Sequence, residues 1–149
     1  MSTQGSEGGR ATRLAAGLLD TNTLILLSQL PDPDTLPTHP LISAVTLAEL
    51  SVGPLAASTP SERESRMVIL QQAEADFDPL PFDAEAARAF GGVAASLRRS
   101  GRKVAARSFD AMIAAIAIAK DLTLFTCNPA DFEGIERLNV VVLRHPSGG

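Results

Sequence analysis

The sequence predicts one α/β domain with about five strands in a mainly parallel sheet. The chain has 149 residues, of which 45% are hydrophobic, enough for one sizeable core. Short apolar runs alternate with longer segments of helical spacing, which is the order expected of an α/β domain. The runs at 123–127 and 139–143 are apolar or β-branched at every position except Asn139. Runs of this kind are typical of parallel strands that are buried on both faces.

The first half of the chain contains two expected strands and three expected helices. The first apolar run ends on Asp20, and small hydroxyl or amide residues follow at once, which indicates a strand that turns into a helix. A Pro-rich loop ends that helix. Ser43 can cap the next helix, which Gly53 and Pro54 would stop. The expected elements are strand 17–20, helix 21–30, strand 41–43, helix 44–52 and helix 61–75.

The second half begins with an irregular strand and ends with two regular ones. Pro79 lies within the short run 77–80, which indicates an irregular strand or one at the sheet edge. Asp83 can cap the following amphipathic helix. Ser108 or Asp110 opens a last helix that is rich in Ala and Ile. The expected elements are strand 77–80, helix 84–99, helix 108–120, strand 123–127 and strand 139–143.

The composition excludes several classes of site. Cys127 is the only cysteine, so no intramolecular disulfide and no cysteine-based zinc site can form, which suits a cytoplasmic protein. No stretch approaches the roughly 20 apolar residues of a membrane span, so no membrane partner is expected. We expect a flexible, polar tail at 1–15, one domain at 16–145 and a short tail at 146–149.

Four acidic residues lie at or near the ends of expected elements. Asp20 ends the first strand, and Glu49 lies inside the second helix. Asp110 is in the first turn of the Ala-rich helix, and Asp131 follows the fourth strand. Ligands of open α/β sheets bind at the carboxyl ends of the strands, where these acids could meet. Clustered carboxylates repel unless a cation neutralises them, and oxygen ligands without His or Cys favour Mg²⁺ or Mn²⁺, which can activate water for phosphodiester hydrolysis.

A purely structural interpretation competes for three of these acids. Asp20 could cap the helix that follows it, the helix dipole favours Asp110 in a first turn, and Asp131 could be an ordinary loop residue. Glu49 is more informative, because an unpaired Glu on a largely apolar helix face needs a reason. A phosphotransferase of the haloacid dehalogenase class would need a second Asp two residues after Asp20, where Asn22 stands.

Four sequence blocks surround these acids and follow one another along the chain. They are LLDTNT at 18–23, SAVTLAEL at 43–50, DAMIAA at 110–115 and LFTCNPADF at 124–132. Together they resemble the PIN-domain ribonucleases, specifically the VapC toxins of bacterial type II VapBC toxin–antitoxin pairs. The resemblance covers residues 16–145 and implies a PIN-like three-layer α/β/α fold around a mainly parallel five-stranded sheet. It also implies a Mg²⁺- or Mn²⁺-dependent endoribonuclease that hydrolyses an RNA, such as a tRNA or rRNA, with metal-activated water.

The resemblance assigns roles to individual residues and names a partner. The fourth acidic position is open between Asn128 and Asp131. Family members are commonly homodimers, held inactive by a VapB-type antitoxin whose C-terminal segment covers the site. The alternative is a non-catalytic PIN-like module whose acidic pocket receives an Arg from a protein partner. The implied catalytic metal ligands are Asp20, Glu49, Asp110 and Asp131, and the supporting polar residues are Asn22, Thr126 and Asn128.

A basic segment precedes Asp110. Five of the 13 basic residues lie within 98–107, and this segment contains no acid. Arg residues at a helix C-terminus complement the helix dipole, which accounts for the first two of them. The other three, Arg102, Lys103 and Arg107, are expected to contact RNA phosphates beside the metal site.

Overall fold

Four parallel strands form the central sheet of the computed structural model, which describes residues 15–148. The strand order is β2-β1-β3-β4, so β1 and β3 are the central strands. All three neighbouring pairs are parallel, and the carboxyl ends of the strands therefore lie at one edge of the sheet. The strands are β1 at Ala16–Leu19, β2 at His39–Leu41, β3 at Thr123–Thr126 and β4 at Val140–Val142.

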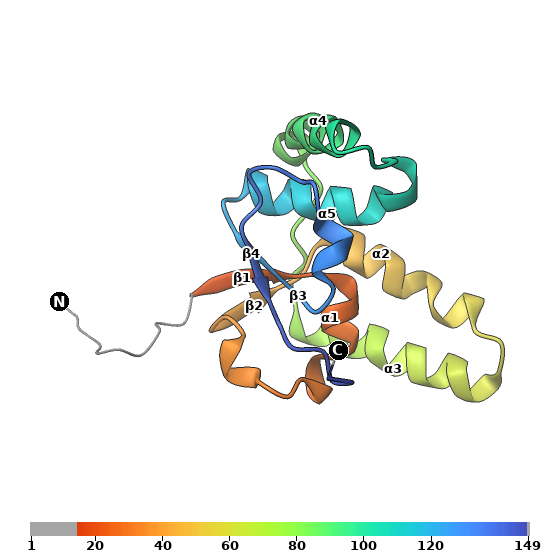
Figure 1. Cartoon of the computed structure of the whole chain (residues 1–149). Helices are drawn as coiled ribbons and strands as arrows, with labels where there is room; N and C mark the ends of the chain where they lie inside the picture. The colour runs from red at the N-terminus through yellow and green to blue at the C-terminus, as the bar shows by residue number, and fades with distance from the viewer. Residues whose placement is uncertain (1–14, 149) are drawn as a thin grey trace, which may run out of the picture.

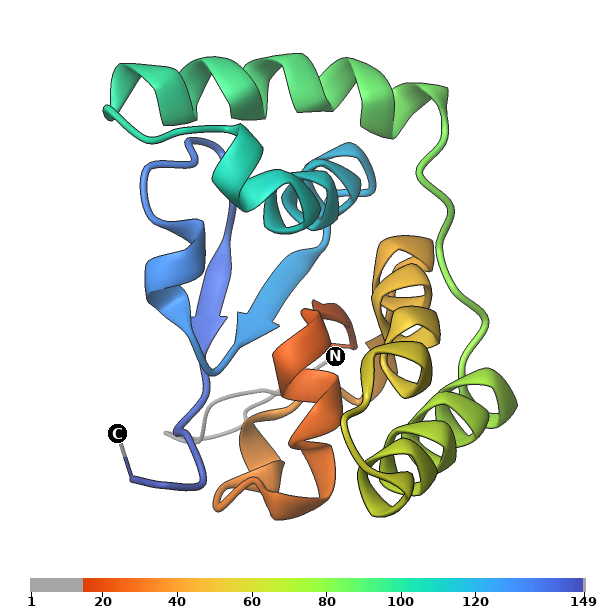
Figure 2. The same ribbon diagram turned by 90° about the vertical axis from the view of Figure 1, so that its right-hand side faces the viewer.

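Helices cover both faces of the sheet, which confirms the expected α/β/α layers (Figures 1 and 2). Helices α4 and α5 lie against one face, while α1 and α3 lie on the other side. Helix α2 contributes buried residues to the cores on both sides. The helices are α1 at Thr21–Ile25, α2 at Ala44–Val52, α3 at Pro60–Asp76, α4 at Ala84–Arg99 and α5 at Ser108–Ala119.

The two central strands separate two hydrophobic cores. Successive side chains of a strand point to opposite faces. Leu18 and Leu124 are therefore buried under α4 and α5, whereas Leu19 and Phe125 are buried on the side of α1 and α3. All four side chains are at most 2% exposed. Burial on both faces is what the apolar run in β3 predicts.

Local capping explains the helices whose bounds were predicted correctly. Ser43 accepts a hydrogen bond from Thr46 N at 3.1 Å and starts α2. Asp83 accepts one from Ala86 N at 3.0 Å and starts α4. These caps use residues close in sequence, so both helices have the bounds expected from the sequence.

One of the five expected strands, 77–80, does not form, so this prediction is wrong. Only Leu80 pairs there, in an isolated parallel bridge with Ser43. Leu80 N donates to Ile42 O at 2.9 Å, and Leu80 O accepts from Ala44 N at 2.8 Å. Pro79 and Pro81 lie on either side of Leu80 and have no backbone N–H. The pairing therefore cannot extend into a full strand, and the sheet has four strands.

Three other elements differ from the expectation in extent or burial. The strand expected at 41–43 lies earlier, at β2, where Pro40 is tolerated because β2 is an edge strand. The helix expected over 21–30 is short, and a 3-10 helix follows it at Leu27–Gln29. Strand β4 is not buried on both faces, because it is the other edge strand, and Val142 is 58% exposed.

The described residues reach only part of the expected tails. The N-terminal tail expected at 1–15 lies outside the described residues except for Ala15, which is exposed. Within 15–148, no helix has the length and apolar character needed to cross a membrane.

Candidate metal centre

The adjacent ends of β1 and β3 form the centre of the candidate site. Asp20 directly follows β1 and is 2% exposed. Its Oδ2 accepts a hydrogen bond from Thr126 Oγ1 of β3 at 2.8 Å, and its Oδ1 accepts one from Thr23 N at 3.1 Å. Asp20 therefore caps α1, as the structural interpretation of the sequence proposed. The same carboxylate is also held from the neighbouring strand, which a cap alone does not require.

The turn after β3 contains Asn128 and Asp131, the two candidates for the fourth position of the site. Thr126 Oγ1 accepts a hydrogen bond from Asn128 N at 2.9 Å. Asn128 O accepts one from Asp131 N at 3.0 Å, at the start of the 3-10 helix Pro129–Phe132. Asp131 interacts electrostatically with Asp20 and Asp110. The turn thus brings the Asp131 carboxylate within electrostatic range of the other acids.

Glu49 is held by a chain of hydroxyl groups. Its Oε1 accepts a hydrogen bond from Thr21 Oγ1 at 2.6 Å. Because the Thr21 hydrogen is used there, the 2.9 Å contact between the Thr21 and Thr46 hydroxyls has Thr46 as its donor. Ser43 Oγ in turn donates to Thr46 Oγ1 at 3.5 Å. Ser43 and Thr46 are fully buried, so this chain of hydroxyl groups fixes Glu49 from the interior of the protein.

Helix α5 brings Asp110 to the same edge of the sheet. The helix begins at Ser108, and Asp110 lies in its first turn. The small residues Ala111, Ala114 and Ala115 are fully buried. Their small size lets the helix lie close to its neighbours. Asp110 is partly exposed, so its carboxylate remains accessible to a ligand.

The electrostatic interactions show that the four acids share one region. Burial, followed by repulsion from Asp131, Glu49 and Asp20, raises the pKa of Asp110 from 3.8 to about 7, and Arg107 opposes this rise. Burial also raises the pKa of Asp20 and of Glu49. Hydrogen bonds from Thr23 and Thr126 oppose the rise at Asp20, and one from Thr21 opposes it at Glu49. A region of this kind favours a bound cation.

The donor set suits a hard divalent cation. The acidic side chains that interact here offer carboxylate oxygens, which Mg²⁺ and Mn²⁺ prefer, and Asn128 in the turn after β3 would offer an amide oxygen. Cys127 does not join them: its backbone N donates to Thr23 Oγ1, and burial raises the pKa of its thiol. Among residues 15–148, no three His, Cys, Asp or Glu side chains are close enough together to hold a metal ion as they stand. Holding a cation here would therefore require these carboxylates to move towards one another.

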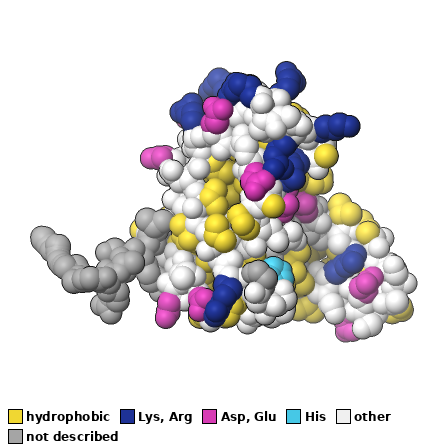
Figure 3. Space-filling view, in the orientation of Figure 1, with side chains coloured by type: hydrophobic (Ala, Val, Ile, Leu, Met, Phe, Trp, Pro, Cys, Tyr) yellow, Lys and Arg dark blue, Asp and Glu magenta, His cyan; other side chains and the backbone are white. Residues whose placement is uncertain are grey.

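The basic segment packs against the turn that carries Asp131. Arg107 Nη1 lies 3.6 Å from Asp131 Oδ1, and Arg102 pairs with Glu133. Within the described part of the chain, Lys103 is exposed and forms no ion pair. Figure 3 shows basic side chains gathered over the upper part of the molecule, around α4 and the segment that follows it. Two of the three expected RNA-contacting residues thus already have acidic partners.

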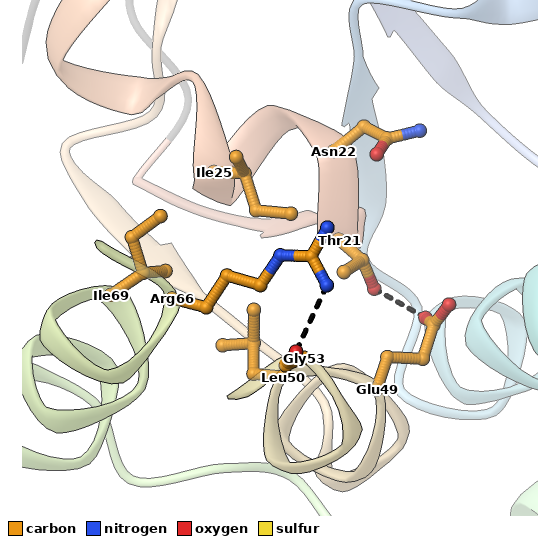
Figure 4. Close-up of a pocket in the computed structure, with 8 residues that line it drawn as sticks. All are labelled: Thr21, Asn22, Ile25, Glu49, Leu50, Gly53, Arg66 and Ile69. Carbon is orange, nitrogen blue, oxygen red and sulfur yellow. Dashed lines mark hydrogen bonds between the residues drawn. The ribbon is translucent and has the colours of Figure 1, made fainter. Parts of the chain in front are cut away.

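The sequence pattern predicts neither the hydroxyl chain nor a groove beside it. Thr21 and Thr46 lie in the motif blocks, but nothing in their spacing predicts that their hydroxyl groups meet. The groove lies between α1, α2 and α3 and includes Arg66, which lies outside all four blocks (Figure 4). Asn22, one of the supporting residues expected from the sequence, is exposed and lines this groove.

Comparisons with known proteins match most of the chain. The family model "PIN domain" matches residues 18–138. Ribonuclease VapC5 of Mycobacterium tuberculosis is 40% identical over 119 residues, which cover 78% of this chain and 85% of the relative. The tRNA(fMet)-specific endonuclease VapC of Shigella flexneri is 36% identical over 94 residues, 63% of this chain and 67% of the relative.

A solved structure agrees with these relatives. The crystal structure of VapBC-5 from Mycobacterium tuberculosis, a member of the VapBC family of toxin–antitoxin systems, matches with a TM-score of 0.74 and 37% identity. The match covers 86% of this chain and 98% of that chain. The family match spans more than half of the chain, and the first relative exceeds 30% identity over most of both lengths. The chain therefore belongs to the PIN-domain family and, within it, to the VapC ribonucleases.

Proposed function

We propose that this VapC-family nuclease is the toxin of a type II toxin–antitoxin pair and hydrolyses RNA phosphodiester bonds at its carboxylate cluster. The observation that carries the proposal is the meeting of acids from four separate segments beside the ends of β1 and β3, where burial, followed by mutual repulsion, raises the pKa of Asp110 to about 7. A folded protein keeps such an unfavourable group of charges at a functional site more readily than elsewhere. The VapC relatives supply the class of reaction.

The cluster would hold Mg²⁺ or Mn²⁺ through carboxylate oxygens. When bound, the cation would lower the pKa of a water molecule and offset the negative charge that develops on the phosphate. Asp110 would release its proton as the cation binds, because the opposite charge favours the carboxylate. The ligands proposed from the sequence and the family are Asp20, Glu49, Asp110 and Asp131, with Asn128 as the neutral alternative for the fourth place.

The surrounding residues of the chain position these ligands. Thr126 fixes one oxygen of Asp20 with its 2.8 Å hydrogen bond, and Thr21 fixes one oxygen of Glu49. Each carboxylate keeps lone pairs for a cation, including the Asp20 oxygen that also caps α1 through Thr23 N. No serine, cysteine or threonine nucleophile is needed, since water attacks the phosphate. Hydroxyl groups that hold metal ligands in this way commonly control metal affinity.

The substrate is proposed to be a structured RNA in the cytoplasm. A tRNA is the first RNA to test, because the Shigella flexneri relative is named for its action on tRNA(fMet). Lys103 is exposed and has no ion pair among the described residues, so it is the basic residue best able to meet a phosphate. Arg102 and Arg107 would first have to exchange Glu133 and Asp131 for phosphate oxygens. Lys103→Gln should therefore weaken RNA binding more than Arg102→Gln.

Cleavage of RNA by the purified chain tests the proposal directly. The wild-type protein with Mn²⁺ should cut total RNA, and mapping the new 5′ ends gives the target and position together. Asp20→Asn and Asp110→Asn should remove cleavage and growth arrest while the protein stays folded. Full activity of both variants would refute the site assignment, and cleavage that persists in EDTA would refute the metal mechanism.

A VapB-type antitoxin is the proposed protein partner. The solved relative is a member of the VapBC toxin–antitoxin family. A non-catalytic binding module is the competing function, and the neutral Asn128 is the feature that favours it. Calorimetry with Mn²⁺ separates the two proposals: a folded protein that binds the antitoxin but neither binds Mn²⁺ nor cuts RNA is the competing module.

A homodimer is the proposed assembly. Exposed apolar side chains lie on α2, the 3-10 helix Pro54–Ala56 and α3, and Leu55 is 86% exposed. Val52 is 58% exposed and Val68 is 48% exposed, so this surface is apolar beyond a single residue. Leu55→Asp should shift a dimer towards monomer in light scattering. An unchanged mass for this variant would place the interface elsewhere.

A further inference from the structure

A groove adjoins the carboxylate cluster on the side of α2 and α3. Its volume is about 410 Å³, which lies within the range of small-ligand sites. Thr21 and Glu49 line one end, so the groove is continuous with the candidate metal centre. Figure 4 shows Glu49 at one side of the pocket and the side chains of Ile25 and Ile69 at the other. The groove therefore has an acidic end and an apolar end.

Arg66 brings a positive charge into this groove from α3. It is the only cationic side chain among the lining residues. Its Nη1 donates to Gly53 O at 2.9 Å, and its Nη2 lies 3.8 Å from Glu62 Oε1, a side chain that is 44% exposed. A guanidinium has five N–H donors, so donors remain for a ligand. Figure 4 shows the guanidinium in the middle of the pocket, pointing towards Thr21.

We propose that this groove binds the sugar–phosphate backbone of the RNA beside the cleaved bond, with Arg66 contacting a phosphate. The inference rests on the proposed hydrolysis of RNA at the neighbouring acids. A polyanion next to clustered carboxylates is repelled unless a cationic group holds it. The basic segment around Lys103 supplies such charge from the α4–α5 side, and Arg66 supplies it from α3. The substrate strand therefore crosses the acidic edge between two positive groups.

The apolar end of the groove indicates how the nucleotide is held. Ile25, Leu50 and Ile69 are aliphatic, and no aromatic side chain lines the groove. Base stacking, which requires an aromatic or guanidinium plane, has little support there apart from Arg66 itself. The aliphatic wall suits the ribose, and the Arg66 fork suits phosphate oxygens. The groove therefore binds backbone and tolerates any base at that nucleotide.

Arg66 also has a structural role that the experiment must separate from substrate binding. Gly53 is the C-cap residue of α2, and the hydrogen bond from Arg66 to its carbonyl satisfies the end of that helix. Loss of this cap would lower stability without changing how RNA binding depends on salt. Each phosphate contact that is lost reduces the slope of log K against log[salt] by about 0.7 for single-stranded RNA. The salt slope is thus the deciding measurement.

The probe is a short single-stranded RNA of mixed sequence, bound to the full chain in an Asp110→Asn background so that it stays uncut. Arg66→Gln removes the charge, and Arg66→Lys keeps it. Arg63→Gln is the matched control, because Arg63 is an exposed residue of the same helix and the net charge changes equally. Cleavage kinetics are measured for the same three substitutions without the Asp110 change.

We expect Arg66→Gln to reduce the salt slope by about 0.7 and to raise KM about tenfold with kcat within about twofold of wild type. Arg66→Lys should keep the slope, and Arg63→Gln should behave like wild type. Equal slopes for Arg66→Gln and Arg63→Gln would overturn the inference. So would an unchanged slope with weaker binding of the VapB-type antitoxin, because the groove would then belong to the protein partner. If wild type cuts RNA and Arg66→Gln cuts it equally well, only this inference fails; if wild type cuts no RNA, the proposed function fails.

Discussion

Replacement of Asp110 by Asn should stabilise the metal-free protein above neutral pH while it abolishes cleavage. Burial and repulsion from Asp131, Glu49 and Asp20 raise the pKa of Asp110 from 3.8 to about 7. The folded protein therefore binds this proton more tightly than the unfolded chain does. As the pH rises from the unfolded to the folded pKa, the folded state loses stability, because the unfolded chain releases its proton in this range while the folded protein still holds its own.

The size of the effect follows from the two pKa values. The difference between 3.8 and about 7 corresponds to roughly 4 kcal/mol for a fully buried carboxylate. Asp110 is partly exposed, so solvent screening reduces the expected loss to about 1–2 kcal/mol. Asn has nearly the same shape without the charge. At about pH 8, Asp110→Asn should raise the free energy of unfolding by about 1–2 kcal/mol, which corresponds to about 3–6 °C in Tm. At about pH 4.5 the increase should be much smaller.

Thermal unfolding in EDTA at the two pH values measures this difference. Asp78→Asn is the matched control, because Asp78 is exposed and its replacement removes the same charge. Added Mn²⁺ should raise the Tm of the wild type, since it binds only the folded state, and should raise that of Asp110→Asn much less. The electrostatic reasoning would be refuted if Asp110→Asn raised the Tm equally at both pH values, or lowered the Tm at the higher pH.

Three further substitutions test the residues that support the site. Thr126→Val removes the hydroxyl that donates to Asp20 Oδ2 at 2.8 Å, so kcat/KM for RNA cleavage should fall about 10- to 100-fold. Thr126→Ser keeps the hydroxyl and should keep this activity. Thr21→Val removes the 2.6 Å hydrogen bond to Glu49 and should weaken Mn²⁺ binding about tenfold in calorimetry. Gly17→Ala would place a Cβ 2.7 Å from Cδ1 of buried Phe125 and should lower the free energy of unfolding in urea by about 1–3 kcal/mol.

For each of these substitutions, one result would contradict the prediction. Equal activity of Thr126→Val and Thr126→Ser would mean that the hydroxyl is not needed. Unchanged Mn²⁺ affinity of Thr21→Val would remove Glu49 or its hydroxyl chain from the metal site. An unaltered urea midpoint for Gly17→Ala would show that the Phe125 ring can move aside.

The sequence was most reliable where neighbouring residues decide the structure. Ser43 and Asp83 bond to backbone groups three residues away, so the starts of α2 and α4 follow from local chemistry. The central strand β3 could be predicted because a strand between two others, covered on both faces, consists of apolar and β-branched residues. The family resemblance likewise depends on short blocks that each keep their own spacing.

The sequence failed where the edges of the sheet decide the structure. The expected strand at 77–80 is apolar enough to pair, but the prolines beside Leu80 leave a single bridge. Strand β4 has the same composition as a buried strand, yet no strand covers its outer edge, and Val142 is 58% exposed. The residues of a strand determine neither how many neighbouring strands it pairs with nor its place in the sheet.

The sequence by itself proposed the acids of the candidate site, because each lies in a block that the family shares, and it left the fourth place open between Asn128 and Asp131. Only the tertiary structure decided how they are held. Asp20 and Thr126 are 106 positions apart in the sequence, and they meet because β1 and β3 are neighbours in the sheet. The hydroxyl chain to Glu49 and the place of Arg66 also depend on contacts between distant segments. Such contacts arise from the packing of whole elements, which no local pattern specifies.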